Sequence, residues 1–436
     1  MAPKKAGTKS ARPAGETPPA KGAAKPAEGG KPAKNGKPPA SPPQPVAPAK
    51  EEPFGVATIL LLGGYGTVGS AIARTLLEQS STCTVLIAGR STENATAMCK
   101  QLNASFPKPG PDPRAKPLTC DAMDTSTLAG CPRFDVIVNA TTMRAVEGVI
   151  TLMRFCASKR AAYLDLRGPI GLEDAVAKAV GDVSPVVLMG GGYCPGALAP
   201  FLKMAANKLA SCTAAHLSIA ATALPSQAEE AIEAMMCGTR LETWGNGKWA
   251  PAQPSAPSFG KAIDFGDGKT RHTTPVGVSE VREVPTELGL DTCSVRFAST
   301  QDGGLMCAAM AVLCCAPCVG LREGIAKHLR AAMERQRALE PNLCACICEA
   351  SGVDKEGKTR KVVLRASHPA GPAMMAAHCA VAQVTQILTG TVSGGTPPRM
   401  CGVALDADKL LGTLIKQGVK ASIETTDVAG DPSYDA

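Results

Sequence analysis

Residues 56–70 read VATILLLGGYGTVGS, and this stretch decides how the chain begins to fold. Val56–Leu62 is an unbroken run of aliphatic and β-branched residues, which is typical of a strand buried on both faces of a parallel sheet. Three glycines follow with the spacing G-x-G-x-x-G, and Ser70–Glu78 then carries apolar residues at helical intervals. The stretch therefore predicts a strand, a glycine-rich turn and a helix in direct succession.

The three glycines of the turn have different physical roles. Gly64 permits the tight turn, Gly66 lets the backbone approach a pyrophosphate, and Gly69 lets the helix pack close to the strand. The amides and the positive dipole at the helix N-terminus then attract phosphate groups. Because the motif lies between a buried strand and a helix, it favours a dinucleotide site over a glycine turn without a ligand. The expected lining residues are Gly64, Tyr65, Gly66, Thr67, Val68 and Gly69.

Further strand patterns alternate with helical patterns up to about residue 210. The strand patterns occur at 82–88, 135–140, 162–166 and 186–189. This alternation implies a parallel α/β sheet with right-handed crossovers, and the glycine turn makes it a Rossmann-type domain. After residue 210, strands follow one another without regular helices, and Asn246-Gly247 is a hairpin signal. The second domain is therefore predicted to be α+β, with a mainly antiparallel sheet.

These patterns divide the chain into five parts. Residues 1–53 are rich in Lys, Pro and Ala, and they cannot bury enough apolar surface to offset the entropy of ordering. They are predicted to be a disordered basic tail. A Rossmann dinucleotide-binding domain is expected at 54–210, and a substrate or dimerisation domain of α+β type at 211–368. A helical return that packs on the Rossmann domain is expected at 369–425, before a flexible C-terminus at 426–436.

The net charge of +8 is confined to the tail. Residues 1–50 hold ten basic side chains against Glu16 and Glu28, so the remaining chain is neutral. A neutral body argues against nucleic-acid binding, which usually requires a basic patch or stripe. The tail also lacks the apolar core of a secretory signal peptide. We therefore expect a cytoplasmic protein, while organelle targeting by the tail stays open.

Cysteine and histidine patterns predict no metal site. The 18 cysteines occur in a long chain without a signal peptide, so reduced thiols are expected. Cys315 and Cys318 have the spacing of a redox or zinc pair, but no second pair stands at zinc-finger spacing. The five histidines form neither H-x-x-x-H nor H-E-x-x-H. The uncharged run Gly303–Leu321 could just span a membrane by its length, but its Pro and Cys content favours a buried helix.

The residues after the second strand bear on the choice between NAD and NADP. An NAD site usually places Asp or Glu there, whereas this chain has Arg90 and Ser91. A guanidinium pairs well with the 2′-phosphate of NADP and stacks on adenine. NADP is therefore expected rather than NAD, with an ordinary surface role for Arg90 as the alternative.

Two other strand ends carry polar residues that we expect at the cofactor. Asp121 is placed near the adenine, and its alternative is a loop or helix-capping role. Asn139, Ala140 and Thr141 end a parallel strand, and ligands of open α/β sheets bind at the carboxyl ends of such strands. A turn held by local side-chain hydrogen bonds is the competing interpretation.

An ordered set of segments resembles the saccharopine dehydrogenase-like family, in the branch with an N-terminal NADP-binding domain. The segments are GGYGTVGS at 63–70, AGR at 88–90, DVIVNATT at 135–142, AYLDLRG at 162–168 and GGYCPGALA at 191–199. Further along, WGNGKWAP and VGVSEVREVP resemble the substrate-side domain of that family. Many Rossmann families share the glycine motif, whereas the ordered set is more specific. The resemblance covers most of residues 54–425 and none of the tail.

The resemblance implies a nicotinamide-dependent oxidoreductase with a small substrate derived from an amino acid. In such enzymes hydride moves between the cofactor and a C–N bond that joins an amino acid to a keto acid. The reaction needs orientation of the substrate and a source or sink for a proton. The polar candidates for catalysis are Tyr163, Asp165, Arg167 and Tyr193. Arg167 is suited to clamping a substrate carboxylate, whereas Asp165 has a turn cap as its structural alternative.

One departure from the family pattern keeps other functions open. Where the family often has Gly-Pro after the strand, this chain has Thr141-Thr142-Met143, which alters the surface near the nicotinamide. One alternative is a catalytically inactive nucleotide-binding member that acts as an interaction or sensing protein. Another is a lipid-associated member that uses Gly303–Leu321, although membrane association is not the main expectation. A homodimer is also a possible assembly, and these patterns do not decide the oligomeric state.

Overall fold

The computed structural model of the chain describes most residues from 52 onward. Its contacts divide the chain into two units, Met1–Lys50 and Glu51–Ala436, and the described residues belong to the second. They are residues 52–108, 111–142, 145–167, 178, 186–222, 241–252, 260–298, 319–392 and 399–427. The predicted basic tail, the Cys315 and Cys318 pair, most of the run at 303–321 and the predicted C-terminal end beyond residue 427 lie outside them.

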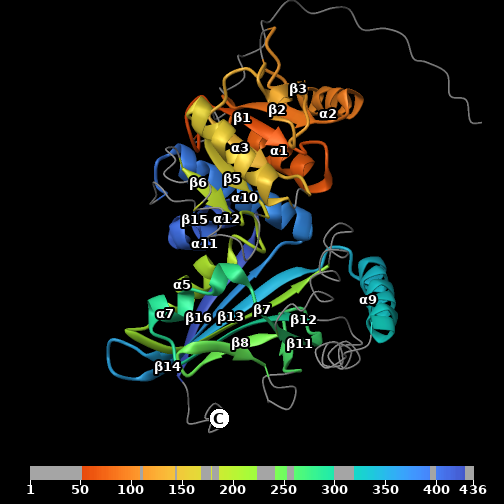
Figure 1. The fold of residues 1–436 in the computed structure, drawn as a ribbon. Helices are drawn as coiled ribbons and strands as arrows, with labels where there is room; N and C mark the ends of the chain where they lie inside the picture. Colours follow the sequence, from red (N-terminus) through yellow and green to blue (C-terminus); the bar gives the residue numbers. More distant parts are fainter. Residues whose placement is uncertain are drawn as a thin grey trace, which may run out of the picture. The chain divides into compact units, whose positions relative to one another are not determined.

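The first sheet has seven strands, all parallel, in the order β15-β6-β5-β4-β1-β2-β3 (Figure 1). Its strands are β1 (Thr58–Leu62), β2 (Thr84–Gly89), β3 (Ala115–Thr119), β4 (Val136–Asn139), β5 (Ala162–Asp165), β6 (Val187–Met189) and β15 (Arg399–Met400). Apart from β15, this is the strand order of dinucleotide-binding Rossmann folds. The predicted parallel sheet is confirmed.

Helices cover both faces of this sheet, which explains the unbroken apolar run of its central strand. Ile59 and Leu61 of β1 pack in a core with α1, α2 and α10, whereas Leu60 and Leu62 pack on the opposite face with α3. All four side chains are at most 1% exposed. The covering elements are α1 (Thr67–Gln79), α2 (Thr92–Ser105), η1 (Thr125–Leu128), α3 (Val146–Lys159) and α10 (Pro372–Leu388).

The second sheet has nine strands, with the main order β10-β11-β12-β7-β13-β14-β16 and with β8 and β9 attached at β12. The pair β12 and β7 is parallel, and the other pairs are antiparallel. The strands are β7 (Ser211–Ala221), β8 (Glu242–Gly245), β9 (Lys248–Pro251), β10 (Ala262–Asp264), β11 (Thr270–Val276), β12 (Thr292–Ala298), β13 (Cys344–Val353), β14 (Thr359–Ser367) and β16 (Lys420–Asp427). The predicted mainly antiparallel sheet is confirmed.

One large apolar core joins the second sheet to the helices above it. Side chains of β7, β13 and β14 meet α5, α7 and α12 there, together with residues from α10. These helices and the remaining elements are α5 (Leu198–Ala206), η2 (Ser279–Val281), α7 (Val284–Leu288), α9 (Val319–Leu339), α11 (Cys401–Ala404) and α12 (Ala407–Lys416). Because α10 contributes to the cores of both sheets, it ties the two halves of this unit together.

The predicted Asn246-Gly247 hairpin is present, a second hairpin joins β13 to β14, and local chemistry explains both. Asn246 and Gly247 join β8 to β9 with φ values of 51° and 72°, which is the backbone that an Asn-Gly hairpin turn requires. Asp354 begins the turn between β13 and β14, and its carboxylate accepts hydrogen bonds from the amides of Glu356 and Lys358 at 2.8 and 2.9 Å. This Asx-type contact closes the charged loop.

The segment after Pro372 contains helix α10 of the predicted helical return and also two strands. Two strands follow α10 in this segment: β15 extends the first sheet, and β16 lies at the edge of the second. β15 has two residues, so it is too short for a periodic signal. β16 reads KASIETTD and is mostly exposed, so it lacks the apolar alternation that predicts a half-buried strand.

The packing of α1 against the first sheet predicts a large effect of truncating Leu76. Its side chain is fully buried in the core that α1 shares with α10. Leu76→Ala is expected to lower the free energy of unfolding by about 2–5 kcal/mol, because a cavity replaces those contacts. Urea unfolding measures the change, with Ile415→Ala as the control, since Ile415 of α12 is 50% exposed. An equal effect of the two variants would contradict this packing.

Candidate functional site

The glycine-rich turn lies at the carboxyl end of β1 and leads directly into α1. The amide of Gly63 donates to the carbonyl of Ala88 at 2.8 Å, which ties the turn to β2. Gly66 is the N-cap of α1 and offers no capping side chain, so the first amides of the helix have no side-chain acceptor. Gly66 and Thr67 are both exposed. The turn therefore presents open helix amides at an exposed sheet edge, which is the arrangement that binds phosphate.

Glycine is required in this turn by close backbone contacts. A Cβ on Gly69 would overlap the carbonyl oxygen of Gly63 and stand 2.9 Å from the α-carbon of Gly64. A Cβ on Gly64 would lie 3.0 Å from the carbonyl oxygen of Leu61. A Cβ on Gly66, in contrast, would meet only the carbonyl oxygen of Gly63, at 3.2 Å. Gly64 and Gly69 are therefore needed for packing, whereas Gly66 leaves space beside the helix N-terminus.

The end of β2 brings Tyr65 of this turn against Gly89. The phenol ring lies over the α-carbon of Gly89, where a Cβ would come within 2.6 Å of its hydroxyl oxygen. That hydroxyl accepts a hydrogen bond from the amide of Ser91 at 3.2 Å. Ser91 itself caps α2, since its side chain accepts a hydrogen bond from the amide of Asn94. Arg90, between these residues, is exposed.

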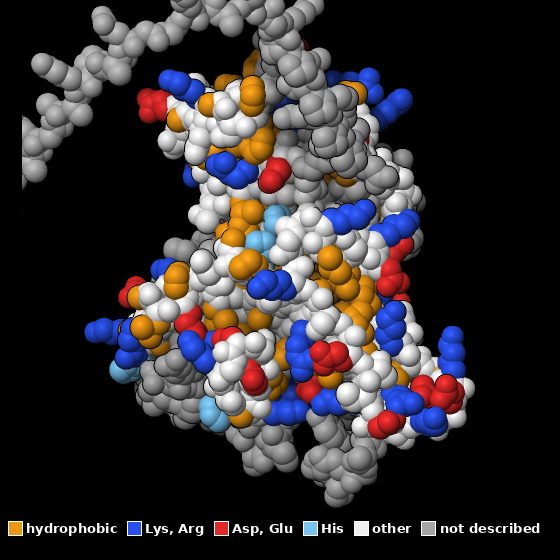
Figure 2. All heavy atoms as spheres, turned by 180° about the vertical axis from the view of Figure 1, so that it is seen from behind, with side chains coloured by type: hydrophobic (Ala, Val, Ile, Leu, Met, Phe, Trp, Pro, Cys, Tyr) orange, Lys and Arg blue, Asp and Glu red, His pale blue; other side chains and the backbone are white. Residues whose placement is uncertain are grey.

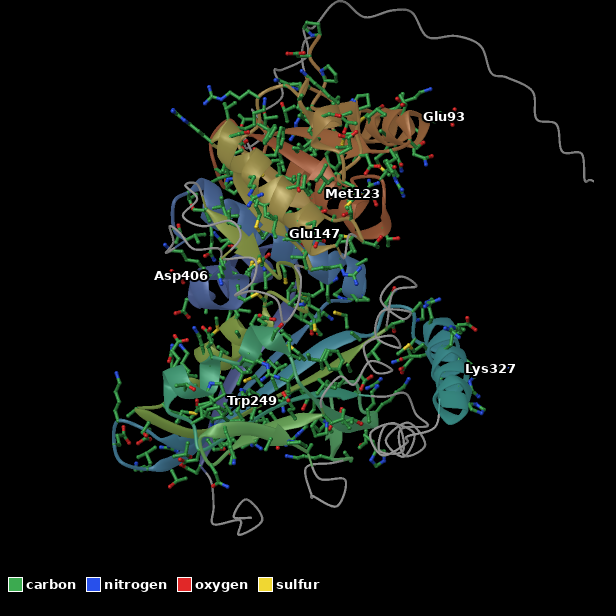
Figure 3. All side chains as sticks on the ribbon, in the orientation of Figure 1. Glu93, Met123, Glu147, Trp249, Lys327 and Asp406 are labelled. Atoms are coloured by element: carbon green, nitrogen blue, oxygen red, sulfur yellow. The ribbon has the colours of Figure 1, made fainter. Side chains whose placement is uncertain are left out.

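Asp121 lies beyond the end of β3 and makes a local contact. Its carboxylate accepts a hydrogen bond from the amide of Met123 at 3.0 Å, as in an Asx turn. Figure 3 labels Met123, together with Glu93 and Glu147 in the first turns of α2 and α3. These positions mark the edge at which the parallel strands end. Asp121 therefore lies at the carboxyl edge of the sheet, as expected, and its carboxylate caps the turn that follows it.

A buried polar network joins the ends of β4 and β5. The side-chain amide of Asn139 donates to the Tyr163 hydroxyl at 3.1 Å and to the Asp165 carboxylate at 3.0 Å. The Tyr163 hydroxyl donates to the same carboxylate at 2.5 Å. The Asn139 carbonyl oxygen accepts hydrogen bonds from the amide and hydroxyl of Thr141 at 3.2 and 2.7 Å. The other oxygen of Asp165 accepts from the amide of Arg167 at 2.9 Å, so the network holds both strand ends.

The two tyrosines among the catalytic candidates are buried. Tyr163 is fully buried and Tyr193 is 4% exposed. Burial raises the pKa of the Tyr163 phenol well above its ordinary value, and the neighbouring Asp165 adds to the effect. Burial also raises the pKa of Tyr193, whose hydroxyl lies beside Cys346. Both phenols therefore stay protonated, and the structure brings Tyr163 together with Asp165 but not with Tyr193.

The turn that carries Tyr193 is held by two residues that sequence reasoning did not single out. Gln383 of α10 pairs with the backbone of Gly192, accepting from its amide at 2.8 Å and donating to its carbonyl at 3.0 Å. Glu280 of η2 accepts from the amides of Gly196 and Ala199 at 2.8 and 3.0 Å, which caps α5 from a distance. Glu280 lies in the VGVSEVREVP segment, and the resemblance of that segment to the family was the only feature of the sequence that pointed to this residue.

Burial changes the protonation of Glu280. The side chain is 1% exposed, and burial raises its pKa to about 7, although the amides of Gly196 and Ala199 oppose the rise. A carboxyl group with a raised pKa in the folded state binds its proton more tightly there than in the unfolded chain. Its contribution to stability is thus complete below pH 4.5 and is lost as the pH rises through 7.

Thiols are numerous in the described part of the chain, and none of them forms a disulfide. Of the 13 free cysteines there, 11 are buried. Burial raises the pKa of Cys83 and Cys120 to about 12, and it also raises the pKa of Cys156 well above its ordinary value. Within the described ranges, no three His, Cys, Asp or Glu side chains could hold a metal ion together. Nor is any described helix long and apolar enough to cross a membrane.

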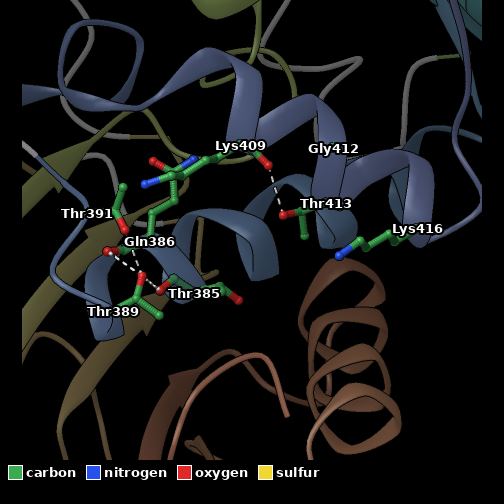
Figure 4. Close-up of a pocket in the computed structure, with 8 residues that line it drawn as sticks. All are labelled: Thr385, Gln386, Thr389, Thr391, Lys409, Gly412, Thr413 and Lys416. Atoms are coloured by element: carbon green, nitrogen blue, oxygen red, sulfur yellow. Dashed lines mark hydrogen bonds between the residues drawn. The ribbon is translucent and has the colours of Figure 1, made fainter. Parts of the chain in front are cut away.

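Two surface cavities lie away from the glycine-rich turn. One, of about 260 Å³, opens between α10 and α12 and is lined by threonines and lysines (Figure 4). The hydroxyls of Thr385, Thr389 and Thr413 there bond to carbonyls of their own helices, so they are engaged. The other, of about 410 Å³, lies where β13 begins and β14 ends and includes His368 and Lys420. On the face drawn in Figure 2, basic and acidic side chains are interspersed.

Comparisons with known proteins agree with this fold. A family model described as the saccharopine dehydrogenase NADP binding domain matches residues 59–231. This segment includes β1 to β6, the glycine-rich turn and the buried network. Residues 59–231 therefore match the NADP-binding domain of saccharopine dehydrogenases, which confirms for this segment the resemblance inferred from its motifs. A search of curated proteins finds no match to the sequence.

A solved structure extends the likeness to the second sheet. The apo form of saccharopine dehydrogenase (L-Glu forming) from Saccharomyces cerevisiae aligns with a TM-score of 0.58 and 13% identity. The alignment covers 85% of this chain and 100% of the yeast chain, and at this identity it shows a shared fold alone. Sorbitol-6-phosphate 2-dehydrogenase from Erwinia amylovora aligns over 35% of this chain and 78% of its own, with 15% identity and a TM-score of 0.24. That overlap is too slight to support an argument.

The raised pKa of Glu280 predicts a pH-dependent loss of stability. Between pH 4.5 and 8, this group is expected to lower the free energy of unfolding by about 3 kcal/mol, because its folded-state pKa is near 7. Glu280→Gln removes the titration and should flatten that part of the profile. Urea unfolding of both proteins across this range measures the difference. Parallel profiles would contradict the assignment.

Proposed function

We propose that the protein is an NADP-dependent oxidoreductase that transfers hydride to or from a C–N bond of an amino-acid-type substrate. The glycine-rich turn is the observation that carries the proposal. It sets an uncapped helix N-terminus at the carboxyl edge of a parallel sheet, within a segment that matches an NADP-binding family. Phosphate binding at such an edge follows from the free amides and the helix dipole.

The residues of the turn fit a dinucleotide. The open side of Gly66 leaves room for a pyrophosphate, and the amides of Thr67 and Val68 point from the first turn of α1 without intrahelical acceptors. Thr141, fixed by Asn139, stands at the end of the neighbouring strand, where the nicotinamide half would lie. When bound, the cofactor supplies the hydride chemistry, and the protein supplies orientation and charge.

NADP is proposed rather than NAD because of the chemistry at the end of β2. The strand ends at Gly89 and is followed by the exposed Arg90, so no carboxylate is present there to accept a hydrogen bond from the ribose of NAD. A guanidinium instead attracts the 2′-phosphate. Charge at this one position thus favours the phosphorylated cofactor.

Arg167 is the proposed substrate-binding residue. It follows β5 at the same carboxyl edge, and its backbone is held by Asp165. A guanidinium at this edge is suited to a substrate carboxylate, because two parallel hydrogen bonds fix its orientation. Tyr163, Asp165 and Asn139 are then positioning residues, since they are buried and bond to one another behind it.

A nucleotide-binding protein without turnover is the second candidate. It is favoured by the burial of Tyr163 and Tyr193, which removes both phenols from contact with a substrate. The Thr141-Thr142 pair, in place of the Gly-Pro of the resembling family, points the same way. A lipid-associated role would depend on residues 303–318, which lie outside the described ranges. Cytoplasmic location and a homodimer stay predictions.

Nucleotide titration tests the cofactor site. Gly66→Asp is expected to weaken NADPH binding at least 100-fold, because a carboxylate then faces the phosphates. Gly66 has an ordinary backbone conformation and Asp is a good N-cap, so α1 should stay folded. Gly66→Asn is the matched control for charge. Unchanged binding by the Asp variant would place the pyrophosphate elsewhere.

Arg90→Ala is expected to weaken NADPH binding by about 10-fold or more and to change NADH binding little, because NADH lacks the 2′-phosphate that the guanidinium is proposed to bind. Fluorescence titration of residues 51–436 with each nucleotide measures both constants. Equal weakening of NADPH and NADH would contradict the assignment of NADP specificity to Arg90.

Turnover separates the two candidate functions. Saccharopine oxidation with NADP, followed by absorbance at 340 nm, is the first assay, because saccharopine has the proposed C–N bond. Arg167→Lys is expected to raise KM for saccharopine about 10-fold, since an ammonium cannot make the two parallel hydrogen bonds of a guanidinium. The dissociation constant of NADPH should not change. NADPH binding without turnover on saccharopine or related imines would favour the second candidate.

A further inference from the structure

We propose that the hydroxyl of Tyr65 donates a hydrogen bond to the 2′-phosphate of NADP and is a specificity-determining group of the site. This inference rests on the proposed NADP binding and adds a residue to it. Tyr65 lies between the first two glycines of the turn, but its side chain reaches away from the pyrophosphate region to the end of β2.

The position of the Tyr65 ring is determined by the absence of a side chain at Gly89. A Cβ at Gly89 would lie 2.7 Å from the ring carbon that bears the hydroxyl, so any other residue would displace the ring. The ring thus takes the place that a side chain at the last residue of β2 would occupy. In dinucleotide-binding folds this strand end faces the adenosine ribose. The phenol therefore stands where the 2′-substituent of the cofactor is recognised.

The hydrogen bonding of the phenol leaves its proton available. The hydroxyl oxygen accepts from the amide of Ser91 at 3.2 Å, which fixes the oxygen at the start of α2. Among the described residues, no acceptor for the hydroxyl proton is present. A hydroxyl that accepts one hydrogen bond can still donate another. Tyr65 is therefore held at the strand end with a hydroxyl proton that can be donated to a ligand.

Donors at this position favour a phosphate over a hydroxyl. The oxygens of a 2′-phosphate only accept hydrogen bonds and carry negative charge, so they gain from both Tyr65 and the neighbouring Arg90. The 2′-hydroxyl of NAD is usually bound by a carboxylate acceptor at the end of β2. Here the next carboxylate along the sequence after that strand is Glu93, which lies in the first turn of α2 (Figure 3). The end of β2 therefore presents hydrogen-bond donors where an NAD site usually presents an acceptor.

Tyr65→Phe tests the inference, because phenylalanine keeps the ring over Gly89 and removes only the hydroxyl. The dissociation constant of NADPH is expected to rise about 10-fold, and that of NADH to stay within about twofold of the unchanged protein. Ser158→Ala is the matched control, since it removes an exposed hydroxyl from the last turn of α3, at the opposite edge of the sheet. Thermal unfolding of each variant reports whether loss of the contact to Ser91 disturbs the fold.

A second variant changes Gly89, the residue against which the Tyr65 ring lies. Gly89→Ala is expected to displace the phenol and to weaken NADPH more than NADH, as Tyr65→Phe does. Equal weakening of both nucleotides by Tyr65→Phe, or unchanged NADPH binding in a folded variant, would overturn the inference while leaving the proposed function intact. If the unchanged protein binds neither nucleotide, the proposed function fails, and the inference fails with it.

Discussion

The capping of α5 by Glu280 is the contact on which the arrangement of this unit depends. The helix packs on β7 and β13 of the second sheet, while its N-terminus continues from the turn that leaves β6 of the first. A carboxyl group from η2 closes the free amides of that N-terminus. Gln383 fixes the same turn from α10. One buried turn therefore receives contacts from the first sheet, from the second-sheet region and from α10, and its position determines where α5 begins.

Local patterns were sufficient to predict much of the fold. The apolar run of β1 and the glycine spacing after it depend on neighbours in sequence, as does the Asn246-Gly247 hairpin. The contacts of Glu280 and Gln383 join residues 81 to 191 positions apart, and no periodicity reports on such distances. β16 was missed for a different reason, because a polar strand at a sheet edge is stabilised mainly by backbone pairing.

The sequence predicted those parts of the candidate site that depend on residues close together in the chain. Parallel strands end at one edge, so the residues after β1, β2 and β4 could be grouped from sequence. Whether a side chain at that edge faces solvent depends on the helices that cover it. Tyr163 and Tyr193 therefore looked like accessible polar groups, although both are buried in cores. The contact between the Tyr65 ring and Gly89 could likewise not be predicted from the sequence, since it depends on the spacing of two adjacent strands.

The buried thiols give the protein a set of internal reporters. Alkylating reagents attack the thiolate, and burial both hides these sulfurs and keeps them protonated. Modification of Cys156 in α3, or of Cys346 in β13, therefore requires the surrounding core to open first. Because such cysteines occur in the cores of both sheets, mass-spectrometric labelling rates would compare how often each half opens under native conditions, without any introduced probe.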